Sequence, residues 1–164
     1  MTEAEKRAKR ACFTGHRPHK LHGCSEEQIK SMLRTEIQKA YDDGFRTFIT
    51  GMAMGVDIWA GELVLELRDT HTDVHLICAL PHEDFEVSWD AQWQARYRSL
   101  LEQADLYRVI SQERHRGVYQ VRNEWMVDRS ARVIAVYNGE AGGTRNTIAY
   151  AAKKNVTVRQ TDVS

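Results

Sequence analysis

Two adjacent glycines are the residues best placed for chemistry, because they fall between a strand-like segment and a helix-like one. The apolar run 132–137 precedes them, and residues 148–153 after them have helical character. The turn itself contains Gly142, Gly143 and Thr144. Strand, glycine turn and helix in this order can form an anion site, because unobstructed backbone N–H groups and the helix start both favour an oxyanion. A tight turn without a ligand needs glycine too.

Three other loops follow strand-like segments, and with the glycine turn they belong on one rim of a parallel sheet. Glycine occurs in three of the four loops, which indicates that backbone comes close to a ligand there. A phosphate-bearing ligand is therefore favoured over turn chemistry alone. The other ligand-binding candidates in these loops are Gly15, His16, Arg17, Gly51, Met52, Gly55, Pro81 and Asn146.

Charged residues near this rim supply the expected partners of a ligand. Arg17 and Lys20 are counter-charges for a phosphate, although each also suits a surface ion pair. Asp57 begins a helix, where it either favours the positive helix end or accepts a hydrogen bond from a ribose hydroxyl. Arg122 and Asn123 lie early in a later helix, where an arginine opposes the helix dipole, so a ligand contact is expected.

Histidines at spacing three raise the question of a metal site. They are His16, His19 and His22, and Pro18 interrupts any helix that would align them. No pair of cysteines supports them, so the sequence predicts neither a metal nor a cofactor. We expect His16 to hydrogen-bond the ligand.

Hydrophobic periodicity predicts alternating strands and helices. Strands are expected at 11–14, 47–50, 73–80, 104–110, 131–137 and 156–159, and helices at 26–43, 56–68, 120–129, after the glycine turn, and on a face with Trp89, Trp93 and Tyr97. This order predicts a single α/β domain, a Rossmann-like three-layer fold with a mainly parallel sheet, over residues 11–164. Residues 1–10 are expected to be a flexible lead-in. The aromatic face suits the core, a base-stacking platform or an interface.

Composition narrows the class of protein. The 164 residues include 23 basic and 23 acidic side chains, so a global electrostatic grip on nucleic acid is not indicated. No apolar stretch approaches the roughly 20 residues that a membrane span needs, and the first ten residues lack the apolar segment of a signal peptide. Three widely spaced cysteines do not form a disulfide framework. A cytoplasmic protein without a membrane partner is expected.

The segments 14–18, 49–60 and 142–144 together resemble the YpsA-like family of the SLOG superfamily, whose relatives include LOG phosphoribohydrolases and DprA/SMF proteins. The resemblance implies a Rossmann-like domain that binds nucleotides or nucleotide-derived ligands on the predicted rim. It also implies a homo-oligomer, since SLOG relatives often pair.

LOG enzymes cleave the bond between a base and ribose 5′-phosphate, and this sequence departs from their pattern. The run 122–126 is similar to their Arg-x-x-x-Met helix, and 143–147 is similar to their Gly-Thr-x-x-Glu turn. Thr147, however, stands where the acid belongs, and a threonine cannot supply a carboxylate. If the chain is an enzyme, the resemblance makes Arg122 and Glu124 the candidate catalytic residues, with Asp57 or Glu62 as other acids.

The sequence therefore favours binding or sensing of a small nucleotide-type ligand, ADP-ribose-like, NAD-derived or a nucleoside phosphate, without turnover. The alternative is an N-glycosidase or phosphoribohydrolase that acts on nucleoside monophosphates. Single-stranded DNA binding, as in DprA-like relatives, is a third and weaker option because the chain has no net charge.

Overall fold

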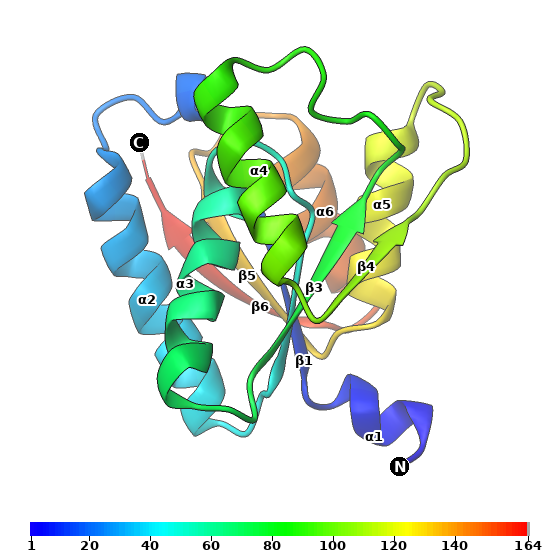
Figure 1. Ribbon diagram of the computed structural model, residues 1–164. Helices are drawn as coiled ribbons and strands as arrows, with labels where there is room; N and C mark the ends of the chain where they lie inside the picture. Colours follow the sequence, from blue (N-terminus) through cyan, green and yellow to red (C-terminus); the bar gives the residue numbers. More distant parts are fainter. Residues whose placement is uncertain (164) are drawn as a thin grey trace.

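Six parallel strands form one sheet in the order β4-β3-β2-β1-β5-β6, as the computed structural model shows for residues 1–163 (Figure 1). The strands are β1 (Arg10–Gly15), β2 (Thr47–Thr50), β3 (His75–Leu80), β4 (Leu106–Val109), β5 (Arg132–Tyr137) and β6 (Thr157–Asp162). The helices are α1 (Glu3–Arg7), α2 (Glu26–Asp42), α3 (Val56–Thr70), α4 (Ala91–Gln103), α5 (Val118–Asp128) and α6 (Gly143–Lys153), with a short 3-10 helix at Pro18–Lys20. The predicted single α/β domain with a Rossmann-like fold is confirmed.

The helices form two layers because the chain reverses its direction across the sheet. From β1 to β4 the strands proceed toward one edge, and their crossover helices α2, α3 and α4 lie on one face (Figure 1). After β4 the chain crosses to β5 and β6 on the other side of β1, so α5 and α6 lie on the opposite face. The loops after β1 and β5 consequently diverge, which creates a topological switch point between these neighbouring strands.

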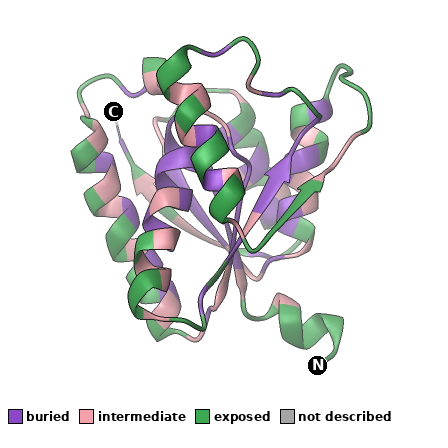
Figure 2. Ribbon diagram, viewed as in Figure 1, coloured by how far each residue is buried: buried purple, intermediate pink, exposed green. Residues whose placement is uncertain are grey.

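The buried residues lie along the sheet, between the two helical layers (Figure 2). Neighbouring residues of a strand point to opposite faces, so Phe13 packs toward α2 and α3 while Cys12 packs toward α5 and α6. Ile134 and Val133 divide in the same way on β5. Burial on both faces explains why the central strands read as almost continuous apolar runs.

Capping residues set the start of α2 where the sequence predicts it. The Ser25 hydroxyl accepts from the Gln28 N–H at 3.1 Å, and the Gln28 side chain accepts from the Ser25 N–H at 2.8 Å. This reciprocal pair satisfies two backbone donors that the helix itself leaves free.

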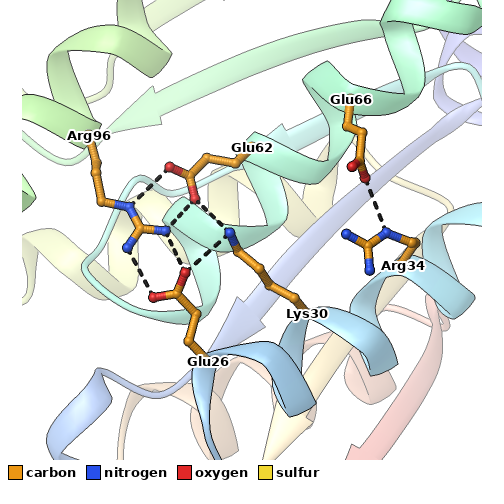
Figure 3. A network of polar contacts seen from close by, with 6 residues as sticks. All are labelled: Glu26, Lys30, Arg34, Glu62, Glu66 and Arg96. Carbon is orange, nitrogen blue, oxygen red and sulfur yellow. Dashed lines mark hydrogen bonds and ion pairs between the residues drawn. The ribbon is translucent and has the colours of Figure 1, made fainter.

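An ion-pair network joins the three helices of one layer (Figure 3). Arg96 of α4 donates to Glu26 of α2 at 3.0 Å and to Glu62 of α3 at 2.6 Å. Lys30 lies 3.2 Å from Glu26 and 3.5 Å from Glu62, so both carboxylates contact two cations. Glu62, which the sequence left as another candidate catalytic acid, thus forms ion pairs that hold the helices together.

Trp89 lies outside the helix on which its spacing places it. The Asp90 side chain accepts from the Trp93 N–H at 3.0 Å and caps α4, so the helix begins at Ala91. Trp89 is buried in the preceding turn, with its ring 5.4 Å from that of Tyr97. Local capping chemistry therefore starts the helix two residues after Trp89, the first aromatic residue of the amphipathic pattern.

Element boundaries otherwise differ from the predictions by a few residues. Strand β3 begins two residues later than predicted, and β4 is shorter than predicted at both ends. Strand β6 extends to Asp162, and α5 begins at Val118. Within the predicted lead-in 1–10, residues Glu3–Arg7 form the mostly exposed α1, which Thr2 caps, and Arg10 already belongs to β1. No helix in residues 1–163 has the length and apolar character to cross a membrane.

Candidate functional site

A cavity of about 410 Å³ lies at the carboxyl end of the sheet, where the loops after β1, β2 and β5 meet the start of α5. It lies at the switch point between β1 and β5, where open α/β sheets bind ligands. Fourteen residues line it: Thr14, Gly15, His16, Arg17, His19, Lys20, Ala53, Asp57, Tyr119, Arg122, Asn123, Gly142, Gly143 and Thr144.

The glycine turn forms one wall of this cavity. Gly142 is the N-cap of α6 with φ 148° and ψ −163°, and no side chain caps the helix. A side chain at Gly143 would meet only the Asn123 amide nitrogen, 3.9 Å from the added Cβ. The first turn of α6 contains no acidic residue. The uncapped start of α6 therefore borders open space in which its partial positive charge favours an anion.

Two cations from the loop after β1 flank the same wall. A Cβ added at Gly142 would lie 3.9 Å from the Lys20 ammonium nitrogen, so this side chain reaches the helix start. Arg17 lines the cavity beside it, and its guanidinium carbon lies 6.0 Å from the centre of the Phe85 ring. Neither residue forms an ion pair with a carboxylate within residues 1–163. Both positive charges are thus available to a ligand.

Arg122 brings a third, buried cation to the cavity. Its Nη1–H donates to the Gly51 carbonyl oxygen, and its Nε–H donates to the Asn123 side-chain oxygen at 2.9 Å. Burial lowers the pKa of Arg122, an effect that the Asp57 carboxylate opposes. Two directed hydrogen bonds hold the guanidinium in place, so it is oriented before any ligand arrives.

Asp57 is a buried carboxyl group in the first turn of α3. Its Oδ2 accepts from the Ala53 N–H at 3.3 Å. Burial raises the pKa of Asp57 to about 6, although Arg122, the Ala53 N–H and Arg17 all act to lower it. A carboxyl group with such a pKa exchanges protons near neutral pH, which is typical of functional sites.

His16 enters the cavity as a neutral ring with a defined tautomer. The Asn138 N–H donates to its Nε2 at 3.0 Å, so Nδ1 carries the proton of the neutral ring. Burial lowers the pKa of His16, and Lys20 lowers it further while Glu140 opposes. The expected role as a hydrogen bonder is therefore that of an N–H donor at Nδ1.

Three glycines of the rim have a packing role. A Cβ at Gly15 would lie 2.5 Å from the Val56 side chain, and one at Gly55 would lie 2.6 Å from the His16 carbonyl oxygen. A Cβ at Gly51 would lie 2.9 Å from both Arg122 Nε and Asp57 Oδ2. These positions need glycine because the loops pack against one another. Gly15 also lines the cavity, whereas at Gly142 and Gly143 an added Cβ would meet no atom closer than 3.9 Å.

The remaining candidates lie outside the cavity lining. Met52 is fully buried with φ 65°, Pro81 is buried at the end of β3, and Asn146 is exposed on α6. Glu124 accepts from the Gln120 amide at 3.0 Å and does not line the cavity. The Thr147 hydroxyl donates to the Gly143 carbonyl oxygen at 2.8 Å, inside the helix.

Tyr119 lines the cavity although the sequence reasoning did not select it. It lies three residues before Arg122 on α5, a spacing that places both side chains on one helical face. That spacing is the signal that could have identified it. Thr14 and Ala53 also line the cavity; both lie in the segments 14–18 and 49–60 that carry the family resemblance, although neither was predicted as a site residue.

Known proteins give three comparisons. A model described as YspA SLOG family matches residues 11–163. UPF0398 proteins of Halalkalibacterium halodurans and of Bacillus thuringiensis (strain Al Hakam) are each 28% identical to this chain, over 87% and 86% of it and 79% and 80% of their own lengths.

Two solved structures share the fold, each with a TM-score of 0.65. DNA processing protein A from Helicobacter pylori, described in terms of its single-stranded DNA binding mode, is 18% identical over 96% of this chain. DNA processing protein A from Streptococcus pneumoniae is 14% identical over 93% of this chain. This chain spans 66% and 50% of their respective lengths.

Proposed function

The chain belongs to the YspA SLOG family, and from that premise we propose that it binds the phosphate of a nucleotide-type ligand without converting it. One observation carries the proposal: the uncapped start of α6 and the cations Arg17, Lys20 and Arg122 meet around one cavity. Backbone N–H groups and positive charges that converge in this way favour a phosphate.

The residues divide into two groups in this proposal. The turn at Gly142 and Gly143 holds the phosphate with Lys20 and Arg17, while the His16 Nδ1–H donates a further hydrogen bond. Asp57, when ionised, accepts from a ribose hydroxyl. ADP-ribose-like, NAD-derived and nucleoside phosphate ligands all fit this division. Sensing of such a ligand, self-association and a cytoplasmic location belong to the same proposal.

Binding without turnover follows from the acids around the cavity. Thr147 occupies the position at which LOG-like turns carry an acid, and its hydroxyl is engaged within α6. Glu124 does not line the cavity. Neither residue can stabilise an oxocarbenium-like centre there.

Asp57 favours N-glycosidase activity as the second candidate function. It is the one carboxylate among the cavity-lining residues of the described chain 1–163. Its pKa, raised by burial to about 6, suits a general acid or base near neutral pH. Base release that Asp57→Asn abolishes would establish this activity and end the proposal of binding alone.

A panel of nucleotides tests the proposal directly. Each nucleotide is incubated with the protein, thermal shift reports binding, and chromatography reports free base. We expect stabilisation without base release. The cavity offers phosphate contacts, but Thr147 replaces the acid that LOG-like turns use for cleavage. An oligonucleotide of deoxythymidine belongs in the panel as a test for single-stranded DNA. Absence of stabilisation by every phosphate-bearing compound would refute the proposal.

Gly143→Val tests the position of the phosphate. The added side chain projects into the open space at the start of α6, where only the Asn123 amide approaches within 4 Å. We expect the fold to persist and the ligand to bind at least about tenfold more weakly, or about 1.4 kcal/mol. Ala149→Val is the matched control, since it adds the same side chain branching to an exposed position on the same helix. Equal ligand-induced stabilisation in the two variants would contradict the placement.

A further inference from the structure

The segment between β3 and α4 places aromatic side chains beside the cavity. The Phe85 ring lies 5.6 Å from that of Tyr119 and 5.7 Å from that of His82. The guanidinium carbons of Arg17 and Arg122, which line the cavity, lie 6.0 Å and 5.7 Å from the centre of the Phe85 ring. The cationic cavity is thus continuous with an aromatic wall.

Tyr119 belongs to both the cavity and this aromatic wall. It lines the cavity from the first turn of α5, and 39% of its surface is exposed. Its neighbours Phe85 and His82 are buried. A half-exposed tyrosine ring on a cavity wall offers a flat apolar face, which is the surface on which heterocyclic bases stack.

His82 carries a hydrogen-bond acceptor that nothing in the described chain uses. Its Nδ1 contacts the Glu83 carbonyl oxygen, and because a carbonyl only accepts, Nδ1 holds the proton of the neutral ring. The acceptor is then Nε2, which is buried and has no hydrogen-bond partner within residues 1–163. Buried acceptors are usually paired, so a donor that reaches Nε2 gains a favourable bond.

Tyr119 lies beside the ring that carries this acceptor. Its ring lies 6.2 Å from the His82 ring with an interplanar angle of 34°, so the two rings are close to parallel. His82 is only 6% exposed, whereas Tyr119 is 39% exposed. The buried acceptor ring thus lies next to a side chain that lines the cavity.

We propose that Tyr119 and His82 form a base-binding site at the edge of the cavity, and that they select nucleotides whose base carries an exocyclic amino group. The base stacks on the tyrosine ring, and the amino group donates to His82 Nε2. This inference rests on the proposed function, since it assumes that the sugar phosphate lies at Gly142 and Gly143. A cavity of about 410 Å³ is large enough for a nucleoside monophosphate.

Isothermal titration calorimetry with five compounds tests the selection in the unmodified protein. AMP and CMP carry the amino group, purine riboside 5′-monophosphate and UMP lack it, and ribose 5-phosphate lacks the base. We expect an amino nucleotide to bind about five- to tenfold more tightly than its matched partner, as for one added hydrogen bond. Ribose 5-phosphate should bind about tenfold more weakly again, because stacking is lost.

Three variants assign the effect to the named side chains. His82→Phe keeps an aromatic ring but removes the acceptor, so the amino preference should disappear while ribose 5-phosphate binds as before. Tyr119→Ala should weaken the nucleotides about tenfold and leave ribose 5-phosphate unchanged. Tyr119→Phe, the matched control, keeps the stacking face and should bind within about twofold of the unmodified protein.

The outcomes separate the two proposals. If neither these five compounds nor any other phosphate-bearing compound of the nucleotide panel binds, the proposed function fails. If other compounds of the panel bind and none of these five does, the base-binding part alone is overturned. If ribose 5-phosphate binds and the nucleotides bind no more tightly, or if AMP and CMP show no preference over their partners, the phosphate site stands and the base-binding part is overturned. A preference that persists in His82→Phe also overturns the assignment. The comparison in the unmodified protein needs no variant to fold.

Discussion

At the scale of single residues, Asp57 and Arg122 lie on either side of Gly51, and each charge shifts the pKa of the other. A side chain at Gly51 would lie 2.9 Å from both the Arg122 Nε and the Asp57 Oδ2 atoms. Arg122 is instead fixed by the Gly51 carbonyl and by Asn123. The two charges are therefore close enough to interact, yet each has polar atoms left for a ligand.

The raised pKa of Asp57 makes a prediction about stability and pH. The folded-state pKa is about 6 and the ordinary value is 3.8. The folded state therefore holds more protons between these values, so the contribution of Asp57 to stability falls as the pH rises from about 4 to 6 and then stays constant. The fall amounts to at most about 3 kcal/mol. Asp57→Asn removes this dependence.

Urea unfolding of the protein and of Asp57→Asn at pH 4.5 and pH 7.5 checks this prediction. We expect the variant to gain stability relative to the unmodified protein as the pH rises. Comparison with the variant cancels the opposite effect of His16, whose lowered pKa costs stability at low pH. Asp69→Asn, exposed at the other end of α3, is the matched control. A pH-independent difference between the protein and Asp57→Asn would contradict burial of the carboxyl group.

Helices α2, α3 and α4 are held together by a network whose members differ in exposure (Figure 3). At this scale Arg96 is central, because its side chain is 27% exposed and contacts carboxylates on two other helices. The neighbouring pair Arg34–Glu66 joins α2 and α3 alone and is 53% and 60% exposed. The first group is partly shielded from solvent, so its charges interact more strongly than those of the second.

We expect Arg96→Met to destabilise the protein by about 1–2 kcal/mol, because it leaves Glu26 and Glu62 close together with only Lys30 between them. Arg34→Met should cost at most about 0.5 kcal/mol. Chemical denaturation at low and high salt measures both values. Equal costs for the two variants would show that partial burial of the Arg96 network adds nothing.

The whole molecule carries 23 basic and 23 acidic residues. Three cations that form no ion pair within residues 1–163, Arg17, Lys20 and Arg122, line the cavity at the carboxyl edge of the sheet. The two DNA processing proteins share this fold at 18% and 14% identity. Fold similarity does not transfer a ligand, because binding depends on the residues that each chain places on the common frame.

For the whole molecule, the salt dependence of the binding constant distinguishes a site for a small phosphate ligand from a surface that binds a DNA strand. Three cavity cations limit the slope of log K against log salt to about −2 for single-stranded DNA. We expect a 20-nucleotide deoxythymidine strand to bind with a Kd weaker than about 10⁻⁴ M near physiological salt. Fluorescence anisotropy at 50 and 200 mM salt measures both quantities. A slope near −5 would indicate a DNA surface that extends well beyond the cavity.

The sequence by itself determined the order of strands and helices, the cap at Ser25 and the glycine turn at Gly142 and Gly143. Each depends on residues that are neighbours along the chain, so periodicity, capping chemistry and the positions of glycine suffice to find them. The near-continuous apolar run of β5 likewise predicted a strand buried on both faces.

Only the tertiary structure decided which side chains meet. Arg122 binds the Gly51 carbonyl across 71 positions of sequence, and Asn138 holds His16 across 122. It also assigned Gly15, Gly51 and Gly55 to packing between loops, and it placed Tyr119 in the cavity. The physical reason is that parallel strands bring distant loops to one edge, while the contacts between those loops depend on side-chain packing that no local pattern encodes.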